Sequence, residues 1–469
     1  MRPTRGYRLL GLLAASTLLA ASTMVGQQVG QQSQFQGSVP RGVASPTPLA
    51  LTLHEAIDRG LKANLGLLVS DSANEAARGQ RLQALSALLP QIHAQASETE
   101  EQLNLKTLGF SLTIPGVNIS SIAGPFHYTD VRAYASWSAF DYSALKNFRS
   151  AQESKRAAQL SVMDARDLVV EATASAYLQI VADASRVEAI RSQVATSQAL
   201  YDRAVDQQNA GTASGIDVLR SQVELKQQQQ RLLAQRNQFD RDKLALGRAI
   251  GLPAGQEFNL SESAPFSPLT SLTQDEALKT ALAQRPDYQS YQARVRAAEQ
   301  TVRAAHGERY PTVGVTADYG DVGYTLANSH GTFSFVAAAK INLFDGGRIS
   351  GDEVRAKAAL KQSQDELADL GGQIDYQVRT AFLDIRTAAD QVAVAQDNLD
   401  LANQTLAQAR DRFAAGVGDN IEVVQAQESV ASANDNLIAA LYAHNLAKIG
   451  LARALGGAEQ GIQKLVEVK

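Results

Sequence analysis

The chain has 469 residues, of which 45% are hydrophobic and 20% charged, and its formal net charge is −4. This charge balance lacks the basic excess of proteins that bind nucleic acid. There is no cysteine, which excludes disulfide bonds, a thiolate nucleophile and a lipid joined through a thioether.

The amino terminus has the layout of an export signal. Arg2, Arg5 and Arg8 precede an apolar stretch over 9–20, and small residues follow to residue 23. This stretch is too short for a membrane helix, so residues 1–23 are predicted to be a signal peptide. Residues 24–50 are rich in Gln, Ser, Gly and Pro and are predicted to form a flexible lead-in.

The rest of the sequence contains an internal repeat of two copies. LTLHEAIDRG, which opens at residue 51, corresponds to LTQDEALKTA, which opens at residue 272. A repeat of about 200 residues is too long for a solenoid unit, so we predict a duplicated domain. The predicted parts are repeat 1 over 51–251, a linker over 252–271, repeat 2 over 272–457 and a C-terminal tail over 458–469.

Each repeat is predicted to open with a helical region, near 52–88 and 273–309. Asn64 and Pro286 mark breaks within these regions, because proline interrupts a helix and asparagine favours helix ends. Pro90 and Pro311 then end the helices and start strands.

A β-hairpin follows in each repeat, over 91–140 and 311–345. In repeat 2 apolar and polar residues alternate from Val313, through a turn predicted near 328–331, to Leu343. In repeat 1 the alternation includes Trp137 and places its apolar face on the same side. Alternation over about ten residues is the weak signature of outer-membrane barrel strands, although a soluble sheet with one buried face gives the same pattern.

The number of strands constrains any membrane role. Two hairpins supply four strands, whereas the smallest closed membrane barrels have about eight. An open sheet edge leaves backbone groups unsatisfied in lipid. Strands in a membrane would therefore require several chains to share one barrel: two chains give eight strands, and three give twelve and begin to leave a lumen.

Long helices with a seven-residue repeat complete each copy. In repeat 2, rows of apolar residues and of alanines recur every seven residues up to a turn at Gly416 and again after it. In repeat 1, a looser pattern of the same kind predicts helices over 148–210 and 216–250, joined by a turn at Gly211. Large residues facing alanines allow close antiparallel coiled coils, although an ordinary helical bundle explains the rows equally well. The descending rows of repeat 2 are Val378, Ile385, Val392, Leu399, Leu406 and Phe413, with Ala381, Ala388, Ala395, Ala402 and Ala409.

The duplication, LFDGG at 343–347 and RFAAGVGDNIEVV at 412–424 together resemble the TolC-type outer-membrane efflux proteins. The resemblance covers about 51–457. It implies a mostly α-helical chain with a membrane β-barrel portion, assembled as a homotrimer with twelve strands and a periplasmic helical tube. It also implies a passive exit duct in the outer membrane of a Gram-negative bacterium, for drugs, metals or other substrates. The implied partners are outer-membrane lipid, a periplasmic membrane-fusion adaptor and an inner-membrane transporter of the RND, ABC or a similar class, in a tripartite pump or a type I secretion system.

Three kinds of site residue are expected. Asp141 and Asp345 stand where a strand becomes a long helix, and helix capping explains both. The turns between the long helices would form the periplasmic tip, where the resemblance implies contact with the adaptor. The tip residues are Gly211, Gly215, Phe413, Gly416 and Gly418. Glycine at a helix end is also expected without any partner.

The resemblance also implies acidic residues around a constriction just above the tip. Glu422 and Asp217 occupy corresponding positions, six residues beyond the turn glycines. Gln425 and Arg220 stand where a second acidic ring would be expected, and Gly418 stands where one member of the family has a basic residue that helps to lock the closed state. Arg220 is therefore a candidate partner for Glu422, while a solvated charge at a helix start is the plainer explanation.

An enzyme is not expected. The six histidines show no metal-ligand spacing, and there is no phosphate-binding loop, dinucleotide fingerprint or serine elbow, so no cofactor is predicted. The alternatives are a periplasmic coiled-coil adaptor or structural protein without a pore, and a family member that has lost its pump role. An adaptor usually carries one coiled-coil hairpin beside small β-domains, whereas this chain has two coiled-coil pairs.

Overall fold

The computed structural model describes residues 35, 37–107, 109, 121–212, 214–261, 273–415, 417–418, 420–459 and 461. The predicted signal peptide, Gly416 and most of the predicted C-terminal tail lie outside them. The chain divides into two units. The first, called the sheet unit, holds Asn74–Ala158 and Tyr291–Leu367; the second, called the helical unit, holds the rest of the described chain.

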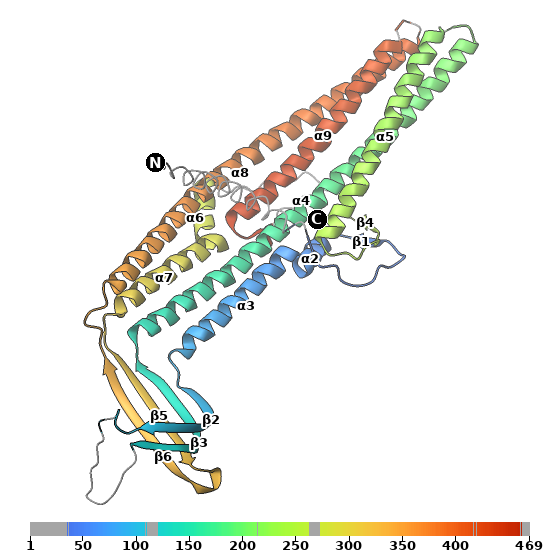
Figure 1. Cartoon of the computed structure of the whole chain (residues 1–469). Helices are drawn as coiled ribbons and strands as arrows, with labels where there is room; N and C mark the ends of the chain where they lie inside the picture. Colours follow the sequence, from blue (N-terminus) through green and yellow to red (C-terminus); the bar gives the residue numbers. More distant parts are fainter. Residues whose placement is uncertain are drawn as a thin grey trace, which may run out of the picture. The chain divides into compact units, whose positions relative to one another are not determined.

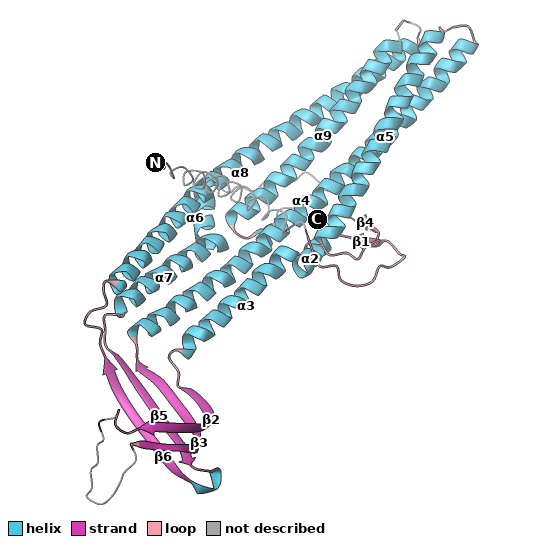
Figure 2. Cartoon of the chain, in the orientation of Figure 1, coloured by secondary structure: helices cyan, strands magenta, loops and turns pink. Residues whose placement is uncertain are grey.

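Helices and strands follow in the same order in both repeats (Figure 1, Figure 2). In repeat 1 the helices are α2 (Leu53–Ala63), α3 (Leu65–Ser86), α4 (Tyr142–Asn209) and α5 (Gly215–Ala249). In repeat 2 they are α6 (Gln274–Gln284), α7 (Pro286–Gly307), α8 (Arg348–Ala414) and α9 (Asn420–Leu455). Within the described ranges, every helix is too short or too polar to cross a bilayer.

The heptad rows are buried where α8 packs against α9. Ile385 contacts Leu451 near one end of the pair, and Leu406 contacts Val423 near the other. All five alanines of the α8 row are buried, which lets the two backbones approach closely. His444 occupies a heptad position on α9 and is also buried.

Helix starts and breaks follow local side-chain chemistry. Thr52 and Thr273 each form a capping box with the glutamate three residues later. Asn64 ends α2, and its Oδ1 accepts from the Gly66 amide at 2.9 Å. Pro286 is the first residue of α7, where its missing amide hydrogen costs nothing.

Within the helical unit, residues 37–51 make backbone contacts with α2 and with the linker, in a stretch where the sequence predicts a flexible lead-in over 24–50. The Val39 amide donates to Ala63 O at 2.9 Å. Strand β1 (Leu49–Leu51) pairs in parallel with β4 (Phe258–Leu260), so the linker between the repeats also contributes a strand. The core beneath this pair contains Leu51, Tyr177, Ile180, Leu246, Ile250 and Phe258.

One antiparallel sheet combines the hairpins of both repeats, in the order β2-β3-β5-β6. The strands are β2 (Gln91–Asn104), β3 (Ile122–Phe140), β5 (Thr312–Gly323) and β6 (Ser329–Lys340). The turn of the second hairpin precedes the predicted 328–331, because a short helix at Leu326–Asn328 reverses the chain and β6 starts at Ser329. β6 also stops short of the predicted Leu343, because Asp345 and two left-handed glycines, Gly346 and Gly347, redirect the chain into α8.

The two faces of the sheet differ in chemistry. A bulge between Ser138 and Phe140 places Phe140 opposite Val313, on the apolar face. The apolar face carries Ile92, Ala94, Val131, Ala133, Ala135, Trp137, Val315, Ala317, Tyr319, Phe333, Phe335, Ala337 and Ala339. The polar face carries Gln91, His93, Gln95, Asp130, Arg132, Tyr134, Ser136, Thr316, Asp318, Thr332 and Ser334. Phe333 and Phe335 are 80% and 67% exposed, so a single chain leaves a large apolar surface uncovered.

Candidate functional site

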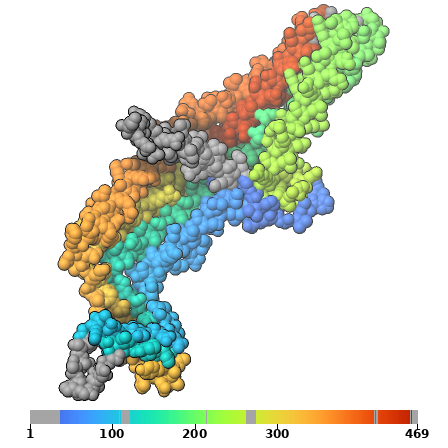
Figure 3. All heavy atoms as spheres, in the orientation of Figure 1, coloured from blue at the N-terminus to red at the C-terminus, as the bar shows by residue number. Residues whose placement is uncertain are grey.

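The α4–α5 and α8–α9 turns lie at the same end of the helical unit (Figure 1), and both reach its surface (Figure 3). Gly211 has φ +74°, a left-handed conformation that favours glycine, and the Thr212 amide donates to Gln207 O at 2.9 Å to close the end of α4. Gly215 is the first residue of α5. These contacts define the shape of the turn without any partner.

The α8–α9 turn packs closely on the end of α8. The Val417 amide donates to Arg412 O at 3.1 Å. A Cβ on Gly418 would lie 3.0 Å from Arg412 Cβ, so a larger residue there would press on the helix. Phe413 packs against the cluster that includes Leu406 and Val423. Gly416 lies outside the described residues.

The charged residues near the turns form short-range pairs. Asp217 Oδ2 accepts from the Ser214 hydroxyl at 2.8 Å, and Arg220 Nη1 lies 3.7 Å from Asp217 Oδ1. Glu422 Oε2 lies 3.4 Å from Arg412 Nε. Within one chain, Arg220 therefore has Asp217 as its charged neighbour and Glu422 has Arg412, and the pairing of Arg220 with Glu422 stays a prediction. These pairs are exposed, and such pairs contribute about 0–1 kcal/mol.

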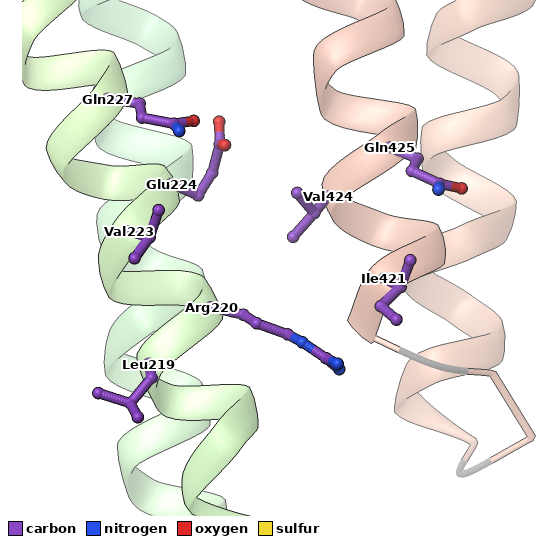
Figure 4. Close-up of a pocket in the computed structure, with 8 residues that line it drawn as sticks. All are labelled: Leu219, Arg220, Val223, Glu224, Gln227, Ile421, Val424 and Gln425. Atoms are coloured by element: carbon purple, nitrogen blue, oxygen red, sulfur yellow. The ribbon is translucent and has the colours of Figure 1, made fainter.

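A groove of about 360 Å³ separates α5 from α9 just above the turns (Figure 4). Arg220 reaches from α5 toward α9 across this groove (Figure 4). The groove is lined by Leu219, Arg220, Val223, Glu224 and Gln227 on α5 and by Ile421, Val424 and Gln425 on α9. Leu219 and Val223 are 58% and 56% exposed, so one chain leaves this surface apolar and accessible.

Beyond the groove, polar contacts join the two return helices. Arg231 of α5 reaches Glu428 of α9 through two contacts of 3.2 and 3.3 Å. Gln228 Nε2 donates to Glu224 Oε1 at 2.8 Å in a buried position on α5. The groove therefore lies between the open turn end and a region where α5 and α9 are linked.

Both aspartates at the starts of the long helices accept backbone hydrogen bonds. Asp141 Oδ1 accepts from the Ala144 amide at 2.8 Å. Asp345 accepts from the Gly347 amide at 3.0 Å and from the Ile349 amide at 2.8 Å. These bonds hold the pKa of Asp345 below its ordinary value.

Sequence reasoning missed a buried charge cluster around Arg453 of α9. Arg453 pairs with Asp164 of α4, and its Nε lies 3.8 Å from Glu171. Burial raises the pKa of Asp164 and Glu171, and Arg453 opposes this rise. No motif marks such a cluster, because its members come from different helices.

Arg285 and Asp287 form the second half of this cluster. Arg285 Nη2 lies 2.6 Å from Asp287 Oδ2, and its Nη1 donates to Gln377 Oε1 at 2.6 Å. Burial opposes the ionisation of Asp287, but the bonds from Arg285 hold its pKa below the ordinary value. Within the described part of the chain, no group of His, Asp and Glu side chains is arranged to hold a metal ion.

The order of elements and the two turns can be compared with known proteins. The pattern of the outer membrane efflux protein family matches residues 56–252 and 277–457. The chain belongs to this family. The toluene efflux pump outer membrane protein TtgC of Pseudomonas putida is 23% identical to this efflux protein over 488 residues, which cover 96% of this chain and 95% of TtgC. Outer membrane protein OprJ of Pseudomonas aeruginosa is 27% identical over 67% of this chain and 65% of OprJ.

Solved structures share the fold of this efflux protein. The outer membrane protein VceC of Vibrio cholerae superposes with a TM-score of 0.73 at 20% identity, covering 86% of this chain and 96% of VceC. The CmeC outer membrane channel of Campylobacter jejuni gives a TM-score of 0.76 at 15% identity, covering 92% of this chain and 95% of CmeC. This efflux protein is accordingly an outer-membrane exit duct of a Gram-negative bacterium with a large periplasmic helical part.

Proposed function

We propose that three copies of this efflux protein share one twelve-stranded barrel. The observation that carries the proposal is the four-stranded sheet with an apolar face, in which β2 and β6 each pair on one side only within the described chain. Unpaired edges are not tolerated in lipid, so strands of other copies must complete them. The 12 residues of β6 are about 40 Å long at 3.4 Å each, enough to cross the membrane when tilted.

In the proposed trimer, the helices continue the barrel as a passive periplasmic duct, and repeats 51–251 and 272–457 contribute equivalent parts. An inner-membrane transporter of the RND, ABC or a similar class supplies the energy, so the duct itself needs no cofactor. TtgC and OprJ are related outer-membrane proteins, and TtgC is named for a toluene efflux pump. We propose the same kind of tripartite assembly here, with substrate choice made mainly by the transporter.

The periplasmic adaptor is proposed to dock at the turn end of the helical unit. The groove between α5 and α9 supports this, because Leu219 and Ile421 offer an exposed apolar contact. Around the shared axis, Glu422 is proposed to form an acidic ring with Asp217 nearby. Arg220 and Gln425 would then contribute to the wall of the constriction.

The native mass in mild detergent, with bound detergent subtracted, tests the proposal. Three chains per particle, and conductance after insertion into a planar bilayer, are the expected results. A particle that stays monomeric and soluble without detergent would overturn it. That outcome would favour the alternative, a periplasmic coiled-coil spacer, which needs neither an apolar sheet face nor a pore.

A further inference from the structure

Arg132 lies flat across the polar face of the sheet. It stands on β3, where it pairs with Gly320 of β5, and Gly320 pairs in turn with Thr332 of β6. Arg132 Nη2 donates to Thr332 Oγ1 at 2.9 Å. Strands are about 4.8 Å apart, so β3 and β6 lie roughly 10 Å apart, and the Arg132 side chain together with this hydrogen bond bridges β5.

Gly320 makes room for this crossing. A Cβ at this position would lie 2.4 Å from Val131 O and 2.7 Å from Arg132 Cβ. Gly314, on the same strand and the same face, has no such neighbour within 4 Å. Gly320 therefore lets the backbones of β3 and β5 approach closely at the place where Arg132 crosses.

Two carboxylates hold the guanidinium from either side. Arg132 Nε donates to Asp130 at 3.3 and 3.4 Å, and Nη1 donates to Asp318. The three side chains are 16–21% exposed, although they lie on an open face of the sheet. One guanidinium and two carboxylates leave one excess negative charge per chain at this level.

Other charges on this face are distant. In the part of the sheet that has four strands, Asp130, Arg132 and Asp318 are the charged residues of the polar rows; beyond this part, Lys340 lies eight residues along β6 from Thr332. That separation is about 27 Å at 3.4 Å per residue, beyond the screening length of about 10 Å in 0.1 M salt. The excess charge around Arg132 is therefore not cancelled locally.

We propose that Asp130 and Asp318, fixed in place by Arg132, line the duct within the sheet and make this section prefer cations over anions. The inference rests on the proposed trimer, in which the apolar face meets lipid and the polar face meets the lumen. Three copies then place three excess negative charges at one level of the barrel. The preference weakens as salt rises, because the screening length falls to about 3 Å at 1 M.

Two variants that break the same ion pair test this role. Asp318→Asn removes a negative charge from the cluster and Arg132→Gln removes the positive one. The cation-to-anion permeability ratio, from reversal potentials in a planar bilayer at about 0.1 M salt, should fall about two-fold in Asp318→Asn and rise by a similar factor in Arg132→Gln. Both changes should shrink at 1 M salt.

Asp321→Asn is the matched control, because Asp321 lies on the same strand but pairs with Val131 on the opposite face. It should leave the permeability ratio unchanged. If the cluster were purely structural, the permeability ratio would change in the same direction in both variants, or only the thermal stability of the folded barrel would change. Either result overturns the inference. A wild-type protein that never conducts would instead overturn the proposed duct.

Discussion

At the scale of single residues, Gly320 of β5 packs closely against β3 at Val131 and Arg132. A methyl group at Gly320 would lie 2.4 Å from Val131 O, so β3 and β5 must separate or Arg132 must leave its place. Gly320→Ala should cost about 1–3 kcal/mol of stability, as overpacking does. The temperature at which the folded barrel unfolds in SDS, read from gel mobility, measures it.

Gly314→Ala provides the comparison for that experiment. It adds the same methyl group to the same strand, where the structure places no neighbouring atom within 4 Å. Its unfolding temperature should stay close to that of the wild type. Equal losses in the two variants would contradict the crowding at Gly320.

Glu422 gives a second prediction at this scale. Three Glu422 carboxylates around one axis would favour cations over anions. Glu422→Gln should therefore lower the cation preference of the pore by about two-fold or more at low salt, measured as a reversal potential. Glu366→Gln, an exposed change on α8, is the control, and unchanged selectivity in Glu422→Gln would exclude the acidic ring.

Contacts between individual side chains were harder to predict from the sequence than the face of a strand or helix on which a residue lies. The alternation placed Arg132 on the polar face, but its reach to Thr332 depends on strand order and register, which alternation does not encode. Likewise, the pairing of Glu422 with Arg412 depends on the shape of the α8–α9 turn. Local pairs such as the capping boxes depend only on the spacing of residues along the sequence, so the sequence alone can predict them.

At the scale of elements, the start of α8 depends on one carboxylate. Asp345 accepts two backbone hydrogen bonds, and its lowered pKa keeps it charged down to values below the ordinary 3.8. Asp345→Ala should speed amide hydrogen exchange at Gly347 and Ile349 and lower the melting temperature. Asp365→Ala, on the exposed face of α8, should change neither. Unchanged exchange in Asp345→Ala would show that the cap is dispensable.

The long helices could largely be predicted from the sequence, whereas the short strands β1 and β4 could not. Heptad spacing and alanine rows predicted the α8–α9 seam, because a helix repeats its contacts every seven residues. β1 and β4 have three residues each, too few for a periodic signal, and they pair across the whole length of repeat 1. The end of β6 was also missed, because alternation continues to Leu343 although the strand stops at Lys340.

At the scale of the whole molecule, the buried cluster around Arg453 predicts an unusual pH dependence. Burial raises the pKa of Asp164, Asp167 and Glu171, so the folded protein binds more protons than the unfolded chain above their ordinary values of 3.8 and 4.5. Their contribution to stability therefore falls as pH rises through that range. Asp287 has a lowered pKa and loses its contribution only at more acidic pH.

The melting temperature of the detergent-solubilised protein should accordingly rise as the pH falls from neutral toward the ordinary pKa values of these carboxyls, 3.8 and 4.5. Glu171→Gln should reduce this rise, because the variant carries no carboxylate there. Glu188→Gln, in an exposed pair on the same helix, should leave the rise intact. A melting temperature that falls steadily over this range in the wild type would contradict the raised pKa values.

The groove at the turn end gives a prediction about assembly. Leu219→Asp places a charge on an apolar wall that we propose meets the adaptor. Efflux-dependent resistance of cells should fall while single-channel conductance and trimer mass stay as in the wild type. Gln222→Asp, an exposed change on the same helix outside the groove lining, should keep resistance, and retained resistance in Leu219→Asp would exclude this docking site.

The pairing of β1 with β4 has a consequence for how the chain matures. Leu49 pairs with Phe258, 209 residues later, and the core around Tyr177 closes only when both strands are present. At roughly 5–20 residues per second, synthesis of that stretch takes about 10–40 s. During this time the first half of the molecule waits with an open core. The core of the first repeat is therefore completed only when β4, from the middle of the chain, pairs with β1 near its start. Until then the chain exposes apolar surface, which makes it a substrate for chaperones that shield such surfaces.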